Sequence, residues 1–325
     1  MGIWLIFAGL WCIFSMQDFA RLPRAYPPYL TGIEMELTNL TCKDCQTPNL
    51  RHARTCRACG ESLGAVNVNI VSDIYFQEGL KKRYAAVLKE VSKRDKLAEV
   101  QRLEEAVEQK GQAVINMPLE ILFKVVNESD AYLSYQRGVE QGKIYARAFN
   151  EEIFQCVIEG VLYGVSGKDV VYAALSLDDN GVSFYGDVSV VLKTQQIARR
   201  TTVFEKDTFP LYNELIESGW KPNKIIPSGH CGTWRERAVV VLIKHSIAVA
   251  EMKSLPDFAR LILKSDDKDY DDDFIELHIW GNITKLNLEK VTLHKKASIN
   301  RYDTLQFRIL QNNLQKQSTT IAAGK

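Results

Sequence analysis

Four cysteines near the N-terminus have the residue type and spacing of a metal site. Two Cys-x2-Cys pairs stand ten residues apart, and they comprise Cys42, Cys45, Cys56 and Cys59. Each pair can direct two thiolates at one ion, and four thiolates complete the tetrahedral coordination of structural zinc. Such a site has no open position for a bound water. The spacing therefore predicts one structural zinc ion per chain, held in a small finger.

The remaining cysteines argue against a disulfide framework. Cys12, Cys156 and Cys231 are scattered, and the total of seven is odd. Secreted frameworks spread pairs along the chain, so this pattern favours a reducing compartment, and we expect a cytoplasmic protein. Cys231 directly follows His230, but adjacent residues cannot easily face one another, so the pair does not predict a thiol nucleophile.

The finger sequence, CKDCQTPNLRHARTCRACGESL, resembles two families. Its spacing is similar to the RanBP2-type finger, some members of which bind single-stranded RNA, although that family has Trp where this chain has Leu40. The ending CRACGESL resembles short bacterial zinc ribbons. The module is basic, and two hypotheses stay open: it contacts phosphates, or it only docks on the body. The basic residues are Lys43, Arg51, His52, Arg54 and Arg57.

The first sixteen residues, MGIWLIFAGLWCIFSM, are almost wholly apolar. A membrane span needs about 20 such residues, and a signal peptide opens with Lys or Arg, which this run lacks. Three interpretations remain: an N-terminal membrane anchor, a helix docked on the core, or a true start at Met16 or Met35. We assign residues 1–34 to an apolar leader and Pro-rich linker, and expect no membrane partner.

Composition excludes several protein classes. Hydrophobic residues make up 46% and charged residues 25% of the 325 positions, which is a globular and not a disordered balance. Lys and Arg number 41 against 40 Asp and Glu, so a nucleic-acid partner would have to be held by a local patch.

The pattern of apolar residues predicts an α+β fold. The finger, residues 35–72, ends in VNVNIV, which is typical of a strand. Apolar residues at three- and four-residue spacings predict a helical connector over 73–111. This connector could pack along the body or bind a partner. Residues 112–310 predict a largely antiparallel β body with flanking helices, and 311–325 a polar, frayed tail. We expect a helical segment at Ala131–Val161 and strands at Val170–Leu177, Val182–Leu192, Ala238–Ala250 and Phe274–Gly281.

Two stretches of the body carry a further resemblance. One runs from Tyr185-Gly186-Asp187 through LKTQQIA to RRTTVF and Asp207-Thr208, and the other is FIELHIWGNIT followed by LEKVTL. Together they resemble the ADP-ribosyltransferase-like toxins. This resemblance implies that fold for the body, NAD as the ADP-ribose donor, and an antitoxin or chaperone partner in a toxin–antitoxin or phage-defence setting. If the finger binds RNA, nucleic acid becomes the natural acceptor.

The resemblance also implies site residues. Glu276 would be the carboxylate that stabilises an oxocarbenium-like state, as carboxylates do in glycosidases. Arg200 would contact NAD, Thr201 and Thr202 would line the site, and Tyr185 would stack on nicotinamide. The residues alone favour a half-exposed strand for Glu276, a surface pair for Arg199-Arg200 and a core position for Tyr185.

Strand alternation adds one expectation: Glu276 shares a face with Phe274 and His278. Phe274 stands where enzymes that modify arginine usually carry Glu, which argues against an arginine target. The polar segment Ser228–Arg237 is expected to border the site, with Glu236 as the second candidate carboxylate. The alternative function is a non-catalytic zinc-finger scaffold that binds nucleic acid or protein.

Overall fold

The computed structural model describes residues 39–128, 130–143, 158–221, 226–265, 272–294, 301–315 and 319–323. The chain divides into two units, Met1–Glu34 and Met35–Lys325, and all described residues belong to the second. The predicted leader and linker lie outside the described residues. Within the described ranges, no helix has the length and apolar character that crossing a membrane requires.

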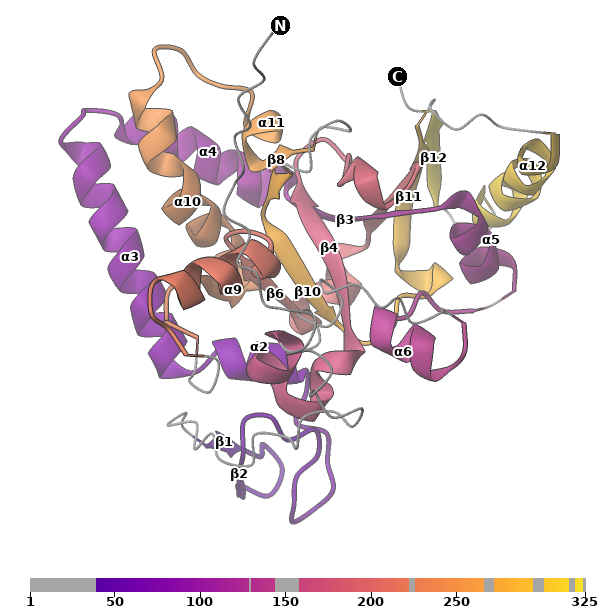
Figure 1. Ribbon diagram of the computed structural model, residues 1–325, viewed down its shortest axis with the longest axis horizontal. Coiled ribbons are helices and arrows are strands. Elements are labelled where there is room, and N and C mark those ends of the chain that lie inside the picture. Colours follow the sequence, from indigo (N-terminus) through magenta and orange to yellow (C-terminus); the bar gives the residue numbers. More distant parts are fainter. Residues whose placement is uncertain are drawn as a thin grey trace, which may run out of the picture. The chain divides into compact units, whose positions relative to one another are not determined.

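An eight-stranded sheet forms the centre of the second unit (Figure 1). The strand order is β12-β11-β5-β3-β4-β10-β6-β7, and every neighbouring pair is antiparallel except β11 and β12. The predicted α+β class with a largely antiparallel sheet is thus confirmed. The strands are β3 (Gln112–Met117), β4 (Val170–Ser176), β5 (Val188–Leu192), β6 (Thr201–Phe204), β7 (Cys231–Thr233), β10 (Glu276–Trp280), β11 (Leu288–Leu293) and β12 (Thr320–Ala323).

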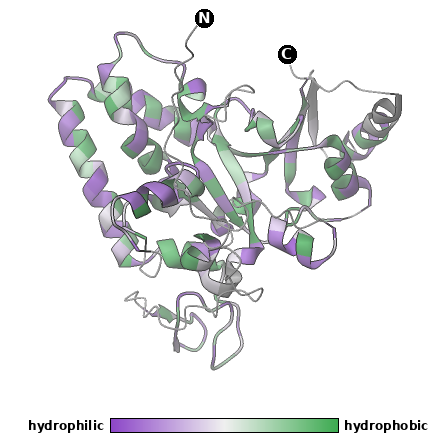
Figure 2. Cartoon of the chain, in the orientation of Figure 1, coloured by the Kyte–Doolittle hydropathy of each residue, from purple (hydrophilic) through white to green (hydrophobic). Residues whose placement is uncertain are grey.

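Helices cover both faces of the sheet, so two apolar cores form. Leu277 and Ile279 of β10 belong to the larger core, with α3 (Ile74–Ser92), α4 (Leu97–Lys110) and α10 (Arg237–Glu251). The smaller core contains Phe204 of β6, with α2 (Val66–Val71), residues 158–163 and α9 (Thr208–Glu217). Figure 2 shows hydrophobic residues on the central strands and many hydrophilic ones on α3. The face of β10 that carries Glu276 and His278 is that of the smaller core.

Two predicted strands are helices. The Ala238–Ala250 segment lies in α10, where a capping box of Thr233 and Glu236 starts the helical turn and burial extends almost all round the helix. Its β-branched residues suggest a strand, but a helix that is buried almost all round has no continuous hydrophilic face to reveal its period. The VNVNIV segment forms α2, which buries Val66, Asn67, Ile70 and Val71. Packing on the sheet therefore overrides local propensity.

Other boundaries differ from the predictions in smaller ways. Val170–Leu177 matches β4 closely, but the Val182–Leu192 strand begins only at Val188, after a 3-10 turn at Ser183–Tyr185. Gly186 allows this turn to lie against β3, because an added Cβ would lie 2.2 Å from the carbonyl carbon of Met117. Contrary to the expectation of a frayed tail, residues 320–323 form β12.

The predicted connector is helical and consists of α3 and α4. The remaining helices lie at the margins of the sheet. The helical segment expected at Ala131–Val161 contains α6 (Tyr135–Glu140) and part of the helical residues 158–163, and residues 144–157 lie outside the described ranges. α5 (Leu119–Asn127) packs against α12 (Arg301–Gln315), on the side of the sheet where β11 and β12 lie in Figure 1. α11 (Phe258–Ile262) leads into a hairpin of β8 (Leu263–Lys264) and β9 (Asp273–Phe274).

Candidate functional site

The four finger cysteines come together as a group that can hold a metal ion such as zinc. Their Sγ atoms all lie within 4.8 Å of one another, with Cys42 and Cys59 3.7 Å apart and Cys45 and Cys56 3.4 Å apart. Tetrahedral zinc with Zn–S bonds of about 2.3 Å requires sulfur–sulfur distances of about 3.8 Å, so the four side chains fit the ion. All four coordination positions would be thiolates, which is a structural and not a catalytic donor set.

Asn49 links the two Cys-x2-Cys turns. It is buried in β2 (Pro48–Asn49), which pairs with β1 (Leu40–Thr41), and its Nδ2 lies 3.5 Å from Cys56 Sγ. Its Oδ1 accepts a hydrogen bond of 2.9 Å from the Arg57 N–H. The N–H groups of Cys59 and Ala58 lower the pKa of Cys56 to about 6, which favours the thiolate that a metal needs.

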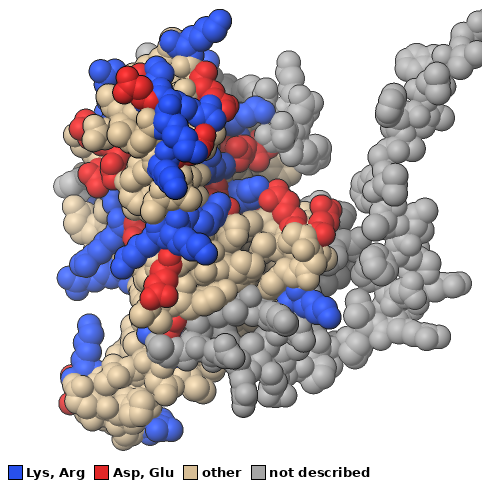
Figure 3. Space-filling model, turned by 90° about the vertical axis from the view of Figure 1, so that its left-hand side faces the viewer, with Lys and Arg blue, Asp and Glu red and all other residues tan. Residues whose placement is uncertain are grey.

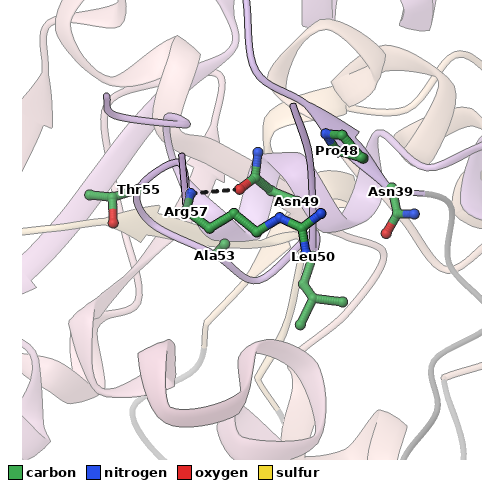
Figure 4. A pocket seen from close by; sticks show the side chains of 7 residues that line it. All are labelled: Asn39, Pro48, Asn49, Leu50, Ala53, Thr55 and Arg57. Atoms are coloured by element: carbon green, nitrogen blue, oxygen red, sulfur yellow. Dashed lines mark hydrogen bonds between the residues drawn. The ribbon is translucent and has the colours of Figure 1, made fainter. Parts of the chain in front are cut away.

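A hollow of about 220 Å³ lies on the finger. Figure 4 shows Asn49 and Arg57 joined by their hydrogen bond on its wall, so the Asn49 oxygen is already used within the finger. The hollow belongs to the finger alone and contains none of the predicted catalytic residues. Its lining residues are Asn39, Pro48, Asn49, Leu50, Ala53, Thr55 and Arg57.

Two of the basic finger residues contact the body. Arg51 forms a 2.9 Å ion pair with Asp73 and donates to the Asn69 carbonyl at 2.8 Å. Arg54 pairs with Asp169, and its guanidinium lies 5.3 Å from the ring centre of Trp280 at the end of β10. These two arginines therefore dock the finger, whereas Lys43, His52 and Arg57 stay exposed.

Glu276 lies on the central strand β10 with only 6% of its side chain exposed. Its Oε2 accepts a 2.8 Å hydrogen bond from the Thr208 N–H, at the first turn of α9, and lies 2.9 Å from His278 Nε2. Its Oε1 makes no hydrogen bond with the described residues. One carboxylate oxygen is thus held from two sides, and the expectation that Glu276 and His278 share a face is confirmed.

His278 connects Glu276 to Tyr163. We assign the His278 proton to Nε2, which faces the Glu276 carboxyl group, so that Nδ1 accepts from the Tyr163 hydroxyl at 2.6 Å. The imidazole is fully buried, with the rings of Phe204 and Tyr172 4.4 and 4.7 Å from it. Packing and hydrogen bonds together fix the orientation of His278.

Asn67 and Thr202 complete this polar network. Asn67 Nδ2 lies 2.8 Å from the His278 carbonyl oxygen and 3.4 Å from Thr202 Oγ1, and its Oδ1 is buried with no partner among the described residues. Thr202 pairs with His278 across the strands, and its hydroxyl is 3.4 Å from that of Tyr163. Of the predicted lining residues, the structure brings Thr202 to the face of Glu276.

The other predicted NAD contacts lie elsewhere. Thr201 turns its hydroxyl to the Ile197 carbonyl, and Arg200 donates to the carbonyls of Trp280, Gly281 and Asn282, at the opposite end of β10 from Glu276. Burial lowers the pKa of Arg200.

Tyr185 is not brought to Glu276 either. It precedes β5, which β3 and β4 separate from β10. Its side chain is 55% exposed and not in the core, so the core expectation for Tyr185 is wrong.

Two further carboxyl groups lie near Glu276. Asp207 caps α9 by accepting from the Phe209 N–H at 2.7 Å, and burial together with the charge of Glu276 raises its pKa to about 7. Burial raises the pKa of Glu159 to about 8, although it accepts hydrogen bonds from Tyr172 and Gln136. The pKa of Asp207 lies near neutral pH and that of Glu159 about one unit higher, and buried carboxyls perturbed in this way are typical of functional sites.

The Ser228–Arg237 segment has a structural role in the described contacts. Glu236 Oε2 accepts from the N–H and hydroxyl of Thr233, which caps the helical turn before α10. Burial strongly raises the pKa of the Cys231 thiol, and His230 Nδ1 contacts Glu205 at 2.6 Å, a geometry that does not favour a thiol nucleophile.

Sequence patterns could find only part of this network. Alternation in FIELHIW places His278 beside Glu276, but Tyr163 and Asn67 reach it across 115 and 211 residues and carry no local signal.

A scan against protein-family models finds no match for the chain, and a search of curated proteins finds no significant relative. The chemistry must therefore be argued from the residues themselves.

Proposed function

We propose that the body transfers ADP-ribose from NAD to an acceptor inside the cell, with Glu276 as the catalytic carboxylate. The observation that carries the proposal is the Glu276 carboxylate, which Thr208 and His278 hold through one oxygen. A fixed carboxylate in a low-dielectric site stabilises a developing cation more strongly than one in water. The resemblance of FIELHIWGNIT to the ADP-ribosyltransferase-like toxins supports the same residue.

In this mechanism the bond between nicotinamide and ribose breaks, and its electron pair leaves with nicotinamide. Oε1 of Glu276 stabilises the positive charge left at the ribose carbon, while Tyr163 and His278 keep the carboxylate oriented. The acceptor then bonds to that carbon, and we assign Asp207 as the base that takes its proton, because Asp207 borders Glu276 and titrates near neutral pH. Since Glu276 is almost fully buried, NAD reaches it only when the covering segments move.

The finger would hold its zinc for structure and the acceptor would be nucleic acid, with RNA the first candidate. An enzyme of this kind is harmful to its own cell, so the proposal includes an antitoxin or chaperone partner and a toxin–antitoxin or phage-defence setting.

The test is Glu276→Gln, assayed with NAD labelled in the adenylate phosphate and a mixture of RNA, DNA and protein. We expect the wild-type chain to transfer label and to be toxic on expression. The variant should stay folded and lose at least about a hundredfold in turnover, on the order of 3 kcal/mol of transition-state stabilisation.

The matched control is Glu289→Gln on β11, which changes an exposed carboxylate of the same sheet. It should transfer label at the wild-type rate. If Glu276→Gln transfers label as fast as this control, the catalytic role of Glu276 is refuted. If the wild-type chain neither binds nor consumes NAD, the enzyme proposal itself is refuted.

A non-catalytic scaffold is the second candidate function. The observation that favours it is the docking of the finger through Arg51 and Arg54, which gives the finger a role without any chemistry. Under this alternative the folded protein would bind nucleic acid or protein but leave NAD untouched.

A further inference from the structure

One helix of the body carries a row of lysines on its exposed side. Lys81, Lys82 and Lys89 of α3 and Lys93, the C-cap of this helix, are all exposed, and we call them the α3 lysine ridge. With about 3.6 residues per turn, Lys82, Lys89 and Lys93 lie on one side of the helix, and Lys81 lies at the edge of that side. The residues between them on this side are the exposed Ala85 and Ala86.

The ridge is a local excess of positive charge. From Ile74 to Lys96 the chain has seven Lys and Arg against three Asp and Glu, whereas the whole chain has a net charge of only +1. Figure 3 views the side of the molecule on which α3 lies in Figure 1, and Lys and Arg gather on that face. The neighbouring helix α4 differs, because Leu97–Lys110 has four Glu against two Lys and Arg.

The cations of α3 fall into two groups. Arg83 is used within the fold, since it binds Glu205 at 2.7 Å and the Gly229 carbonyl at 2.7 Å. Lys93 pairs with Glu90 of α3. In contrast, Lys81, Lys82 and Lys89 make no hydrogen bond or ion pair with any residue of the described ranges. Their charge does not stabilise a contact of this fold.

A solvated helix usually balances such lysines with carboxylates one turn away. Here the exposed Glu78 lies one turn before Lys81 and Lys82. One turn toward the C-terminus no carboxylate follows, because the residue four positions after Lys81 is Ala85, that after Lys82 is Ala86, and that after Lys89 is Lys93. Lys89 and Lys93 are like charges one turn apart, and the pairing of Lys93 with Glu90 offsets only part of their repulsion. The repulsion is relieved when a polyanion lies along the ridge.

We propose that the α3 lysine ridge binds the phosphate backbone of nucleic acid. From Lys81 to Lys93 the ridge is about 18 Å long at the helical rise per residue. The short side chains of Ala85 and Ala86 let a backbone approach the helix closely. Lysine ammonium groups act as point charges for phosphate and read no sequence, so binding is independent of base sequence.

The composition of the ridge favours nucleic acid over an acidic protein. Lysine is depleted at protein–protein interfaces, whose affinity comes from buried aromatic and arginine anchors. The ridge offers only two alanines as apolar contact. An acidic protein partner is therefore the alternative that the experiment must separate.

The experiment measures binding of fluorescent 30-nucleotide RNA and DNA, single- and double-stranded, by anisotropy between 50 and 200 mM salt without NAD. The variant Lys81→Glu/Lys82→Glu/Lys89→Glu should weaken binding at least about tenfold and reduce the salt slope by about two to three, since each phosphate contact contributes about 0.7 to 0.9. The glutamine triple variant should weaken binding less than the glutamate one.

The matched control reverses three exposed charges away from the ridge: Arg102→Glu/Lys110→Glu/Lys253→Glu. It should bind as the wild-type chain does, and thermal unfolding should show that all variants are folded. The proposal is overturned if the wild-type chain does not bind nucleic acid at 50 mM salt, or if only an acidic polypeptide binds. It is also overturned if the glutamate triple variant of the ridge binds nucleic acid as tightly as the control triple variant does. Because no NAD is present, failure of the proposed transfer reaction would leave this result unaffected.

Discussion

At the scale of residues, the buried face around Glu276 is costly to build. Glu159, Thr202, Glu276 and His278 are each at most 5% exposed, and burying polar groups costs free energy unless every one is hydrogen-bonded. The Asn67 oxygen and the Thr208 hydroxyl remain without partners among the described residues. Apolar side chains on this face would avoid that cost, so the retained network supports the catalytic role proposed for Glu276.

The raised pKa values predict how stability depends on pH. A carboxyl whose pKa is higher in the folded than in the unfolded state binds more protons when folded. Stability is therefore greatest below the unfolded pKa and falls as pH rises through the folded pKa. For Glu159, with a folded pKa of about 8, this loss spans pH 4.5 to 8.

Glu159→Gln keeps the shape of the side chain and removes the titration. We expect the wild-type free energy of unfolding, from urea melts, to fall between pH 6 and 9 by at least about 1 kcal/mol more than that of the variant. The free energy of unfolding of Glu289→Gln should fall with pH by as much as that of the wild-type chain. Equal losses in all three proteins would show that Glu159 has an ordinary pKa.

At the scale of elements, sequence patterns succeed best where one side of an element faces water. α3 and α4 bury one side, so their spacing predicts helices. The alternation within FIELHIW predicts β10 as a strand, although both faces of this strand are buried. The same reasoning fails for α10 and α2. Apolar residues of these helices, such as Val240 and Val66, pack into the two cores, so contacts with the sheet and not local propensity determine the helical structure. The Cys-x2-Cys turns need only four residues each, so the metal group could be predicted fully.

The finger itself leads to a prediction about metal. We expect about one zinc per chain, and Cys42→Ser or Cys59→Ser should lose it and unfold the finger while the body keeps its unfolding transition, because the metal supplies the folding free energy of such modules. Asn49→Ala should weaken zinc binding about 10- to 100-fold, as loss of a group that orients a ligand does.

Metal analysis and competition with a chromophoric chelator measure both effects. Asn39→Ala is the control, because this exposed residue belongs to the same finger and makes no hydrogen bond with the described residues. Four freely titratable thiols in the native wild-type chain would contradict the metal assignment. Equal zinc affinity in the two alanine variants would contradict the role of Asn49.

At the scale of the molecule, the polar network depends on segments that are distant in the chain. α2, residues 158–163, β6, α9 and β10 each supply a group to the face of Glu276. Their convergence follows from the strand order, in which β10 lies between β4 and β6. A sequence pattern reports on neighbours along the chain, so it could nominate Glu276 and Thr202 but not Tyr163 or Asn67.

The division of the chain into Met1–Glu34 and Met35–Lys325 leads to the last prediction. A chain that starts at Met35 retains the metal group, the sheet and the α3 lysine ridge, and it lacks the apolar run, which is shorter than the about 20 residues of a membrane span. We expect it to be soluble, to bind one zinc, and to match the full chain in thermal unfolding and NAD consumption. Sedimentation and fractionation with membranes compare the two forms. If the full chain is recovered with membranes and the shorter one is inactive, the N-terminal run is an anchor that function requires.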